Sequence, residues 1–558
     1  MTSADIQREE MPVDVLFVGA GPASLAGAIR LAQIASDRSL DLEIAVIEKG
    51  KEVGAHAVSG AILKPEPLWE LIPDARDRGC PIEASVRGDG LYWLTPDRAL
   101  RSPFVPRHLH NKGRLIVSLS KLTRWLGGQA EELGINIFPG FAGTEVLYAD
   151  NGRRVKGVRT DDKGLGKDRT PKANFEPGID LTARVTVLGE GAHGSLFQQV
   201  SSRLGLKKNS QPEQYEVGIK EVIQIPETSP FASLPSNALH FMGHPLGIRE
   251  PGGGFIYEMD QSRLALGFLL GLGYRDPGLD LYEMFLRFKA HPFIHGLIKG
   301  GKVLEQGART VNTGGLFTMP GLTADGLICV GNMAGFHNTP ALKGIHLAMR
   351  SGMLAAEAIA EAISANDCSK QSLRSFEQKV DNSEIRTEML EGRNVQQALN
   401  RKGLGKFVHL GAQYLTKGRG LSDPLPGEPE HRMLQPLPGR NPDAPVFSPP
   451  EEEPELFVDK LTGIYLSKTA HREDQPCHLE ILDPSLCGRT CLEQYGCPCT
   501  RFCPGGVYEL EDSGTDAPWI RVTPANCLHC KTCAIKDPLE NIAWHCPEGG
   551  DGPKYKAV

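Results

Sequence analysis

Long uncharged apolar runs are absent from this sequence of 558 residues. The longest such window, LALGFLLGLGY between Arg263 and Arg275, has 11 residues and several glycines. A helix that crosses a bilayer needs about 20 apolar residues, so the sequence predicts no transmembrane segment. The first residues, MTSADIQREEM, lack the apolar core of a secretory signal and carry acids that transit peptides avoid. We therefore expect a cytoplasmic, bacterial protein.

A surplus of positive charge is also missing. The net charge is -7, and charged and hydrophobic residues make up 23% and 40% of the chain, as in ordinary globular proteins. A surface that binds nucleic acid usually brings a basic excess, so we expect no nucleic-acid partner. The length of the chain predicts two or three domains.

Cysteine is scarce in the first 476 residues, which contain only Cys80, Cys329 and Cys368, whereas the last 82 residues contain ten cysteines. Disulfides are rare in a reducing compartment, so the clustered thiols are better explained as metal ligands. Between the two regions, residues 417–455 are rich in proline, glycine and charge. This segment predicts an extended connector and the main domain boundary.

The N-terminal region carries a dinucleotide-binding pattern. An apolar strand over Val13–Val18 leads into the turn GAGPAS, a helix follows, and a second strand ends at Glu48. Gly19 and Gly21 would let backbone N–H groups approach a pyrophosphate, and Glu48 would accept hydrogen bonds from a ribose. A tight turn without a ligand is the alternative, but the strand–helix–strand context argues against it.

Two further glycine turns favour FAD over NAD. VTVLGEGAHG (residues 185–194) and GLICVGNMAG (residues 326–335) each place a strand before a glycine turn, and a long helix is predicted over Leu342–Ile363. Asn332 would be a neutral partner of the ribityl chain. The small residues of GAHAVSGA (residues 54–61) would admit the flavin ring, and His56 among them is interpreted as structural rather than catalytic. The predicted FAD contacts are Gly19, Gly21, Pro22, Ala23, Glu48, Lys49, Ser59, Gly60, Gly191, Gly331, Asn332 and Gly344.

The motif NCLHCKTCAIKDP (residues 526–538) has the bacterial ferredoxin spacing C-x2-C-x2-C, with Asp537 at the fourth position. In that pattern the fourth ligand of the cluster comes from a distant Cys-Pro pair, here Cys503 and Pro504. Asp537 favours a single cluster, and Lys531 adds positive charge beside it. A zinc site is the less favoured alternative. The predicted ligands of one [4Fe-4S] cluster are Cys503, Cys527, Cys530 and Cys533.

Four more cysteines lie just upstream, at Cys487, Cys491, Cys497 and Cys499. Two interpretations stay open, a second iron–sulfur cluster and structural thiols. The second is favoured because the spacing C-x3-C-x5-C-x-C matches no established cluster loop. Cys477 and Cys546 are assigned no role.

The chain resembles the electron-transfer-flavoprotein:ubiquinone oxidoreductase family from about Met11 to its C-terminus. The segments that carry the resemblance are GAHAVSGAIL, YEVGIKEV, PGGGFIYEM, GGKVLEQGAR, LKGIHLAMRSG, HREDQPCHL, NCLHCKTCAIKDP and PEGGDGP. The resemblance implies an enzyme that oxidises reduced electron transfer flavoprotein and passes electrons through FAD and one [4Fe-4S] cluster to ubiquinone or menaquinone. It also implies a monomer attached peripherally to a membrane surface, in a bacterium the cytoplasmic face of the inner membrane.

The resemblance further implies an α/β FAD-binding fold, a glutathione-reductase-like Rossmann variant. An α+β quinone-binding domain is interleaved with it, and a ferredoxin-like iron–sulfur domain follows. The implied domains are a tail at 1–10, FAD-binding parts at 11–210 and 321–400, a quinone-binding domain at 211–320, an amphipathic segment and linker at 401–455, and the iron–sulfur domain at 456–558. Gly252 and Gly253 match the backbone pair that faces the quinone, with a simple hairpin turn as the alternative.

Two amphipathic segments with basic residues, 103–125 and 404–415, match membrane-contacting elements of the family. An ordinary core helix is the alternative for the second. Ser118 stands where the family pattern has an arginine near the flavin. The upstream cysteines resemble the ferredoxin partner of nitrogen-fixation flavoproteins, so a fixation-type or bifurcating quinone reductase with another donor is an alternative. A polyprenyl reductase or a flavin monooxygenase would not need the ferredoxin-like tail, and a metal-binding scaffold would not need the glycine turns.

Overall fold

The computed structural model describes residues 7–260, 262–437, 447–511, 514 and 518–558, and its main sheet is built around the predicted N-terminal strand. The strand order is β19-β20-β13-β1-β2-β8, with β9 and β10 attached beside β13. Strand β1 pairs in parallel with β2 and β13. Its residues Val15, Leu16 and Phe17 are fully buried, as expected for a strand covered on both faces. The strands are β1 (Glu10–Val18), β2 (Ile44–Glu48), β8 (Asn136–Pro139), β9 (Gly143–Ala149), β10 (Arg154–Thr160), β13 (Asp180–Leu188), β19 (Thr323–Ala324) and β20 (Leu327–Cys329).

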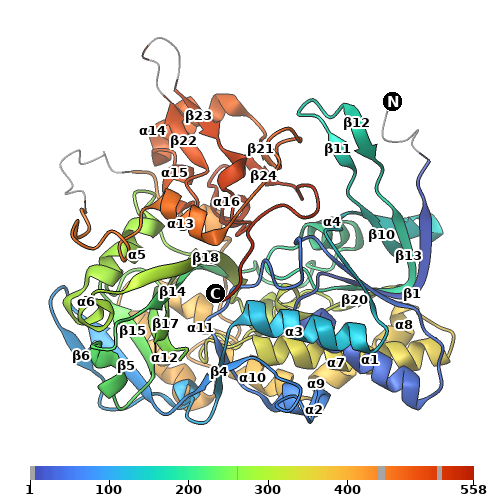
Figure 1. Cartoon of the computed structure of the whole chain (residues 1–558), viewed down its shortest axis with the longest axis horizontal. Coiled ribbons are helices and arrows are strands. Elements are labelled where there is room, and N and C mark those ends of the chain that lie inside the picture. The colour runs from blue at the N-terminus through green and yellow to red at the C-terminus, as the bar shows by residue number, and fades with distance from the viewer. Residues whose placement is uncertain (1–6, 261, 438–446, 512–513, 515–517) are drawn as a thin grey trace.

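Helices α1, α3 and α7 pack together below this sheet in Figure 1. The predicted long helix is confirmed as α7, which begins after its N-cap residue Gly344 and not at Leu342, where the left-handed φ of 55° excludes helical conformation. Helices α1 and α7 approach closely at Gly27 and Gly352, where a Cβ on Gly352 would overlap the carbonyl oxygen of Ala23. Apart from α5 and α6, the helices described up to residue 416 are α1 (Pro22–Asp37), α2 (Glu66–Leu71), α3 (Leu119–Glu132), α4 (Ser195–Leu204), α7 (Ile345–Ser364), α8 (Lys370–Leu373), α9 (Ser375–Asp381), α10 (Glu384–Gly392), α11 (Val395–Leu399) and α12 (Gly405–Thr416).

A second, seven-stranded sheet has the order β18-β14-β17-β16-β15-β5-β6, and its neighbours are antiparallel except for β5 with β15. Its strands are β5 (Asp89–Leu94), β6 (Ala99–Arg101), β14 (Tyr215–Gln224), β15 (Ala238–Gly243), β16 (Gly252–Glu258), β17 (Arg263–Gly271) and β18 (Lys302–Asn312). Helices α5 (Leu281–Ala290) and α6 (Pro292–Ile298) belong to the same core. Smaller sheets join β3 (Ile62–Leu63), β4 (Ile82–Ser85) and β7 (Leu115–Val117), and β11 (Lys163–Leu165) with β12 (Pro171–Glu176).

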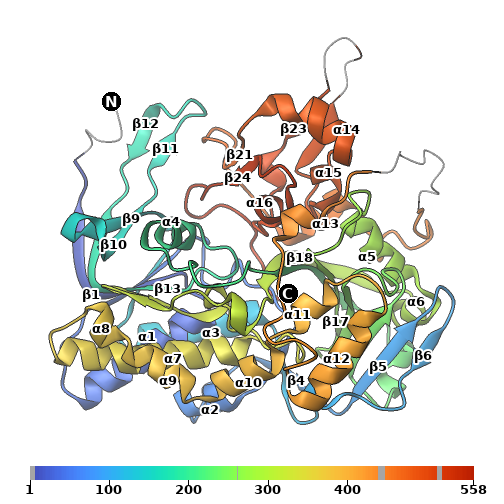
Figure 2. The same ribbon diagram turned by 180° about the vertical axis from the view of Figure 1, so that it is seen from behind.

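The C-terminal segment lies above the second sheet in Figures 1 and 2, and its helix α13 packs on β18. It contains two small sheets, β21 with β24 and β22 with β23. Its elements are α13 (Lys460–Ser467), β21 (Leu479–Ile481), a π-helical turn η9 (Cys487–Cys491), α14 (Leu492–Tyr495), α15 (Cys499–Phe502), β22 (Tyr508–Glu511), β23 (Trp519–Val522), α16 (Thr532–Lys536) and β24 (Ile542–Trp544).

The predicted connector contains no strand in its described parts, and its one short helical turn is η7 (Glu430–Met433). The connector nevertheless packs on the rest of the protein, because Leu425 and Leu434 are buried and Glu430 accepts a hydrogen bond from the Tyr215 backbone N–H at 2.9 Å. Residues 438–446 of the connector lie outside the described residues. No helix in the described ranges is long and apolar enough to cross a bilayer.

Replacing Gly352 with leucine is expected to force α7 away from α1, because the new side chain would overlap backbone atoms of α1. Overpacking of this kind costs roughly 1–3 kcal/mol or more, so the midpoint of chemical unfolding should fall. Gly128→Ala in α3 is the matched control, since a Cβ there meets no atom within 4 Å. It should leave stability unchanged or slightly raised. Equal unfolding midpoints for the two variants would contradict the packing argument.

Candidate cofactor sites

A large cavity lies between the main sheet, the second sheet and the C-terminal segment. Its lining includes the turns that follow β1, β13 and β20, the face of β14, and the start of α7. Two C-terminal residues, Lys531 and Cys546, complete the wall. All twelve predicted FAD contacts line this cavity: Gly19, Gly21, Pro22, Ala23, Glu48, Lys49, Ser59, Gly60, Gly191, Gly331, Asn332 and Gly344.

The turn after β1 depends on glycine and on Glu48. Gly19 has a φ of +89°, and a Cβ there would lie 3.0 Å from the Gly189 carbonyl oxygen. The Glu48 carboxylate accepts hydrogen bonds from the backbone N–H groups of Ala20 at 2.9 Å and Gly50 at 2.7 Å. Glu48 therefore holds the turn against β2, and each oxygen keeps a lone pair that could accept a ribose hydroxyl.

Two helix N-termini at the cavity lack side-chain caps. Helix α1 begins after Gly21 and α7 begins after Gly344, and neither glycine can satisfy the first backbone N–H groups. Such N-termini favour anions because the free N–H groups and the helix dipole act together. The arrangement of glycine turns and uncapped helices thus fits an elongated cofactor that carries phosphates.

Asn332 was predicted to contact the ribityl chain, and the structure shows a second role for its side chain. Its amide group accepts a hydrogen bond from the Asn312 N–H at 2.9 Å and donates one to the Asn312 carbonyl at 3.0 Å. This pair fixes the turn after β20 to the end of β18. One amide hydrogen and one oxygen lone pair stay free for a ligand.

Arg309 and Lys531 are among the basic side chains that line the cavity. Burial lowers the pKa of the Arg309 guanidinium, and it lowers the pKa of Lys531 to about 7. The Lys531 ammonium donates to the His193 carbonyl at 2.7 Å. Ser118, by contrast, does not line the cavity but caps α3. Arg309 was not among the predicted FAD contacts, although it ends the segment GGKVLEQGAR that carries the family resemblance. Strand β18 brings it to the cavity from a distant part of the chain.

Glu216 and Lys220 project from β14 and also line the cavity. Burial raises the pKa of Glu216 to about 7 and lowers that of Lys220 to about 8. The Lys220 ammonium has no hydrogen-bond partner within the described ranges. Both groups can therefore exchange protons near neutral pH. Sequence reasoning missed them, although their spacing in YEVGIKEV places them on one face of a strand.

Gly252 and Gly253, the predicted quinone contacts, begin β16 and pair with Leu270 and Leu269 of β17. They are absent from the cavity wall, which β16 reaches through Phe255 and Tyr257. A Cβ on Gly252 would overlap the Leu269 carbonyl oxygen. Glycine is thus required at this point by the close approach of the two strands.

The four predicted cluster ligands converge on one small pocket, lined by Cys503, Cys527, Cys530 and Cys533 together with Lys531, Tyr508 and mostly apolar neighbours. Burial and the neighbouring Cys530 raise the pKa of the Cys503 thiol to about 11, and a bound cation would reverse this shift. In the described part of the chain, no three of the four sulfur atoms lie within 4.8 Å of one another. Tetrahedral zinc would need separations of about 3.8 Å. The wider set fits a polynuclear cluster.

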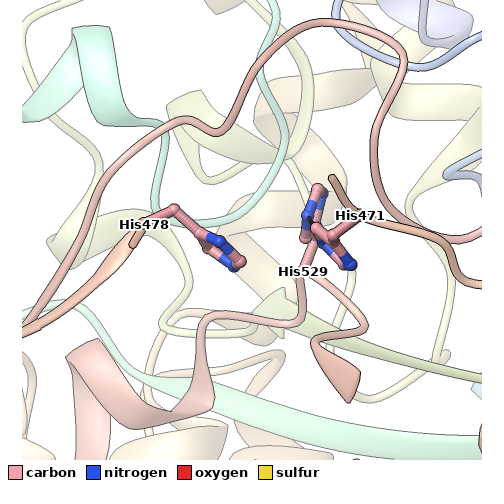
Figure 3. Close-up of side chains that lie close together, drawn as sticks. All are labelled: His471, His478 and His529. Atoms are coloured by element: carbon pink, nitrogen blue, oxygen red, sulfur yellow. Dashed lines mark hydrogen bonds between the residues drawn. The ribbon is translucent and has the colours of Figure 1, made fainter. Parts of the chain in front are cut away.

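Three histidines cluster at the cysteine loop (Figure 3), where nitrogen atoms of His471, His478 and the loop residue His529 lie within 4.8 Å of one another. Lys49 Nζ lies 3.3 Å from His529 Nδ1, and His529 Nε2 lies 2.9 Å from His471 Nε2. His471 Nδ1 lies 3.2 Å from the Ala525 carbonyl. A single direction of donation, from Lys49 through His529 and His471 to Ala525, satisfies all three bonds with neutral imidazoles. The histidines thus connect the cavity to the cysteine loop.

The remaining cysteines and His56 occupy different places. Cys546 lines the cavity, whereas Cys477 is exposed. His56 also lines the cavity, and its ring meets that of His529 edge-on with the centroids 5.0 Å apart. The upstream cysteines line a second small pocket of their own, together with Asp537.

Comparisons with known proteins assign the family. Residues 215–311 match the family model described as "ETF-QO, ubiquinone-binding", and residues 454–556 match "Electron transfer flavoprotein-ubiquinone oxidoreductase, 4Fe-4S". The chain is 40% identical over 564 residues to the mitochondrial electron transfer flavoprotein-ubiquinone oxidoreductase of Arabidopsis thaliana, covering 100% of this chain and 86% of that protein. The chain belongs to the electron transfer flavoprotein-ubiquinone oxidoreductase family.

A bacterial member of the family, from Pseudomonas aeruginosa, is 37% identical to this chain over 556 residues. The match covers 99% of this chain and 100% of that protein. Among solved structures, a geranylgeranyl bacteriochlorophyll reductase-like protein of Thermoplasma acidophilum shares the fold with a TM-score of 0.55. It is 19% identical, and the match covers 71% of this chain and 89% of that one. The predicted family and fold class of this electron transfer flavoprotein-ubiquinone oxidoreductase homologue are confirmed.

Replacing Cys530 with alanine is expected to remove one four-iron cluster, because the pocket then keeps only three thiols. Iron and labile sulfide in anaerobically purified protein should each fall by about four per chain. Cys477→Ala is the control, since that thiol is exposed and lies outside both pockets. If both variants keep the wild-type iron content, the ligand assignment is wrong.

Proposed function

We propose that this protein oxidises reduced electron transfer flavoprotein and passes the electrons through FAD and a [4Fe-4S] cluster to ubiquinone. The observation that carries the proposal is the shared wall between the two sites, since Lys531 lines both the cavity and the four-cysteine pocket. When bound, the two cofactors supply one-electron transfer between a donor and a two-electron acceptor. The chain's own residues hold them next to each other in a buried interior.

Residue roles follow from the positions of the side chains. We assign the Gly19 turn and the start of α1 to the pyrophosphate, and Glu48 to a ribose, because backbone N–H groups and carboxylate lone pairs suit these partners. The other predicted contacts would surround the rest of FAD. Cys503, Cys527, Cys530 and Cys533 would hold the cluster. A polyprenyl reductase or a flavin monooxygenase would leave this pocket of thiols unexplained.

An outward-facing apolar surface supports attachment to a membrane. Helix α12 turns Val408 and Leu415 outward, 64% and 82% exposed, while it buries Lys406, His409 and Gln413. Its polarity is thus the reverse of that of an ordinary surface helix. Figure 2 shows α12 at the edge of the molecule, beside the second sheet. We call the exposed apolar side chains of this helix and of the residue before it the α12 surface; they are Leu404, Phe407, Val408, Tyr414 and Leu415.

The α12 surface lies near one end of the cavity. The rings of His108 and Tyr414 are 6.1 Å apart. Lys343 and the half-exposed Leu342 line the cavity. Of the predicted segment 103–125, only the beginning contributes, because β7 and α3 follow and are largely buried. An apolar quinone could therefore enter from a bilayer on this side.

Gly252 and Gly253 remain our proposed quinone contacts, on the strand that reaches the cavity through Phe255. We propose that the protein acts as a monomer bound peripherally to the cytoplasmic face of a bacterial inner membrane. The α12 surface supports the membrane part of this proposal, because exposed apolar patches of this kind mark membrane or protein contacts.

The function is tested by mixing anaerobic holoenzyme with reduced electron transfer flavoprotein, with and without ubiquinone in vesicles. We expect reoxidation of the flavoprotein only when ubiquinone is present. Cys477→Ala should behave as wild type, whereas Cys530→Ala should lose quinone-dependent turnover because the cluster pocket is incomplete. Equal rates with and without ubiquinone would rule the proposal out.

The membrane contact is tested by replacing Val408 and Leu415 together with glutamate. Each substitution removes about 1.5–3 kcal/mol of free energy gained by burying an apolar side chain in lipid. Vesicle binding measured by flotation should therefore fall about tenfold or more. Turnover with a short-chain, water-soluble quinone should persist. The matched control replaces Leu461 and Tyr465 of α13, which are 64% and 80% exposed. Vesicle binding that drops equally in both double variants, or in neither, would show that the α12 surface is not the contact.

A further inference from the structure

The second pocket of the C-terminal segment brings together five side chains that could bind a metal. Four are thiols and one is a carboxylate, and they are Cys487, Cys491, Cys497, Cys499 and Asp537. The rest of the wall is mainly apolar, with Ile481, Tyr508, Ile520, Leu539, Asn541 and Ile542. Cys491, Cys497 and Cys499 are buried, and Cys487 is half-buried. Nothing in the proposed function uses this pocket.

The backbone is shaped to bring these thiols together. Cys487 and Cys491 occupy the two ends of the π-helical turn η9. Such turns are rare in proteins, and those that occur are often found at functional sites. Gly496 and Cys497 then both adopt left-handed conformations, with φ of 64° and 53°. This conformation is costly for a residue with a side chain and persists where the surroundings demand it. It turns the chain back so that Cys497 and Cys499 reach the same pocket.

Each of the two cysteine-containing segments, 487–503 and 527–537, contributes its last residue to the pocket that is lined mainly by the other segment. Cys533 lines the first pocket, and four residues later Asp537, followed by proline, lines the second. Cys499 lines the second pocket, and four residues later Cys503, also followed by proline, lines the first. Two-cluster ferredoxins exchange the fourth position of each motif between their clusters in this way. The second pocket therefore occupies the place of a partner cluster.

We propose that this second pocket binds a second [4Fe-4S] cluster, held by Cys487, Cys491, Cys497 and Cys499. Asp537 accepts a hydrogen bond from the backbone N–H of Asn541, and we assign the ligand positions to the four thiols because cysteine thiolates are the usual ligands of such clusters. In the described ranges, no three ligand atoms of this pocket lie within 4.8 Å of one another, which is too wide for one tetrahedral ion. Asn541 Nδ2 lies 3.8 Å from Cys487 Sγ, so an N–H donor to a cluster sulfur ligand is already in place.

The second pocket extends the chain of sites already described. Tyr508 lines both cysteine pockets, while the second pocket shares no lining residue with the cavity. The three sites are therefore adjacent in the order cavity, first pocket, second pocket. This inference goes beyond the proposed function, which needs one cluster only.

The proposal is tested by metal and sulfide analysis of anaerobically reconstituted full-length protein. Wild type should contain about eight iron and eight labile sulfide per chain, and the double variant Cys491→Ala, Cys499→Ala about four of each with FAD retained. Cys477→Ala should match wild type. The paramagnetic spectrum of the reduced wild type should show two interacting clusters, and that of the double variant a single one.

Four irons in the reconstituted wild type would overturn the proposal, as would one zinc per chain that the double variant loses. The wild-type count decides the matter even if the double variant fails to fold. The two proposals fail separately. Eight irons per chain without oxidation of electron transfer flavoprotein would support the second cluster and refute the proposed function. Four irons per chain with quinone-dependent turnover would support the proposed function and refute the second cluster.

Discussion

The packing of the cysteine loop at residues 527–533 against the cavity wall is the contact on which the rest of the structure depends. Lys531 donates to the His193 carbonyl at 2.7 Å, and the hydroxyl groups of Thr532 and Thr310 lie 3.1 Å apart. Lys536 is fully buried, and its ammonium donates to carbonyl oxygens that include those of Tyr274 and Glu430. A buried cation is tolerated only with such partners, so the loop is held in one position.

The chain end strengthens the same contact. Tyr555 is buried, and its hydroxyl accepts a hydrogen bond from the Ala308 N–H on β18 at 3.3 Å. The Glu305 carboxylate accepts bonds from the backbone of Lys556 at 2.7 Å and Ala557 at 2.6 Å. The C-terminal segment is therefore not a module on a loose connector. Electron transfer between two cofactors requires a short and constant separation, and these contacts would maintain it.

The proposed membrane side shows how packing can reverse the usual meaning of a helix pattern. In α12, Gln413 donates to the Asn394 carbonyl at 2.9 Å and Lys406 to the Arg249 carbonyl at 3.2 Å. The polar side chains are used to dock the helix, which leaves Val408 and Leu415 to face outward. Periodicity alone indicates an amphipathic helix and cannot say which face is buried.

Much of this protein could be predicted from short stretches of sequence, because those features are local. A strand followed by the Gly19 turn and a helix, and three cysteines at ferredoxin spacing, impose their geometry over a few residues. The family resemblance extends these to the whole chain. The position of Gly252 outside the cavity wall, by contrast, depends on the pairing of β16 with β17, which the local sequence does not determine.

Only the tertiary structure determines which residues from distant segments meet in one site. Arg309, Glu216 and Lys531 meet at one cavity because three elements far apart in sequence converge there. Asp537 was interpreted as a sign of a single cluster, yet the fold places it among four thiols from another loop. The physical reason is that spacing along the chain determines which groups a short loop can present. Burial between packed elements determines which groups share one enclosed site.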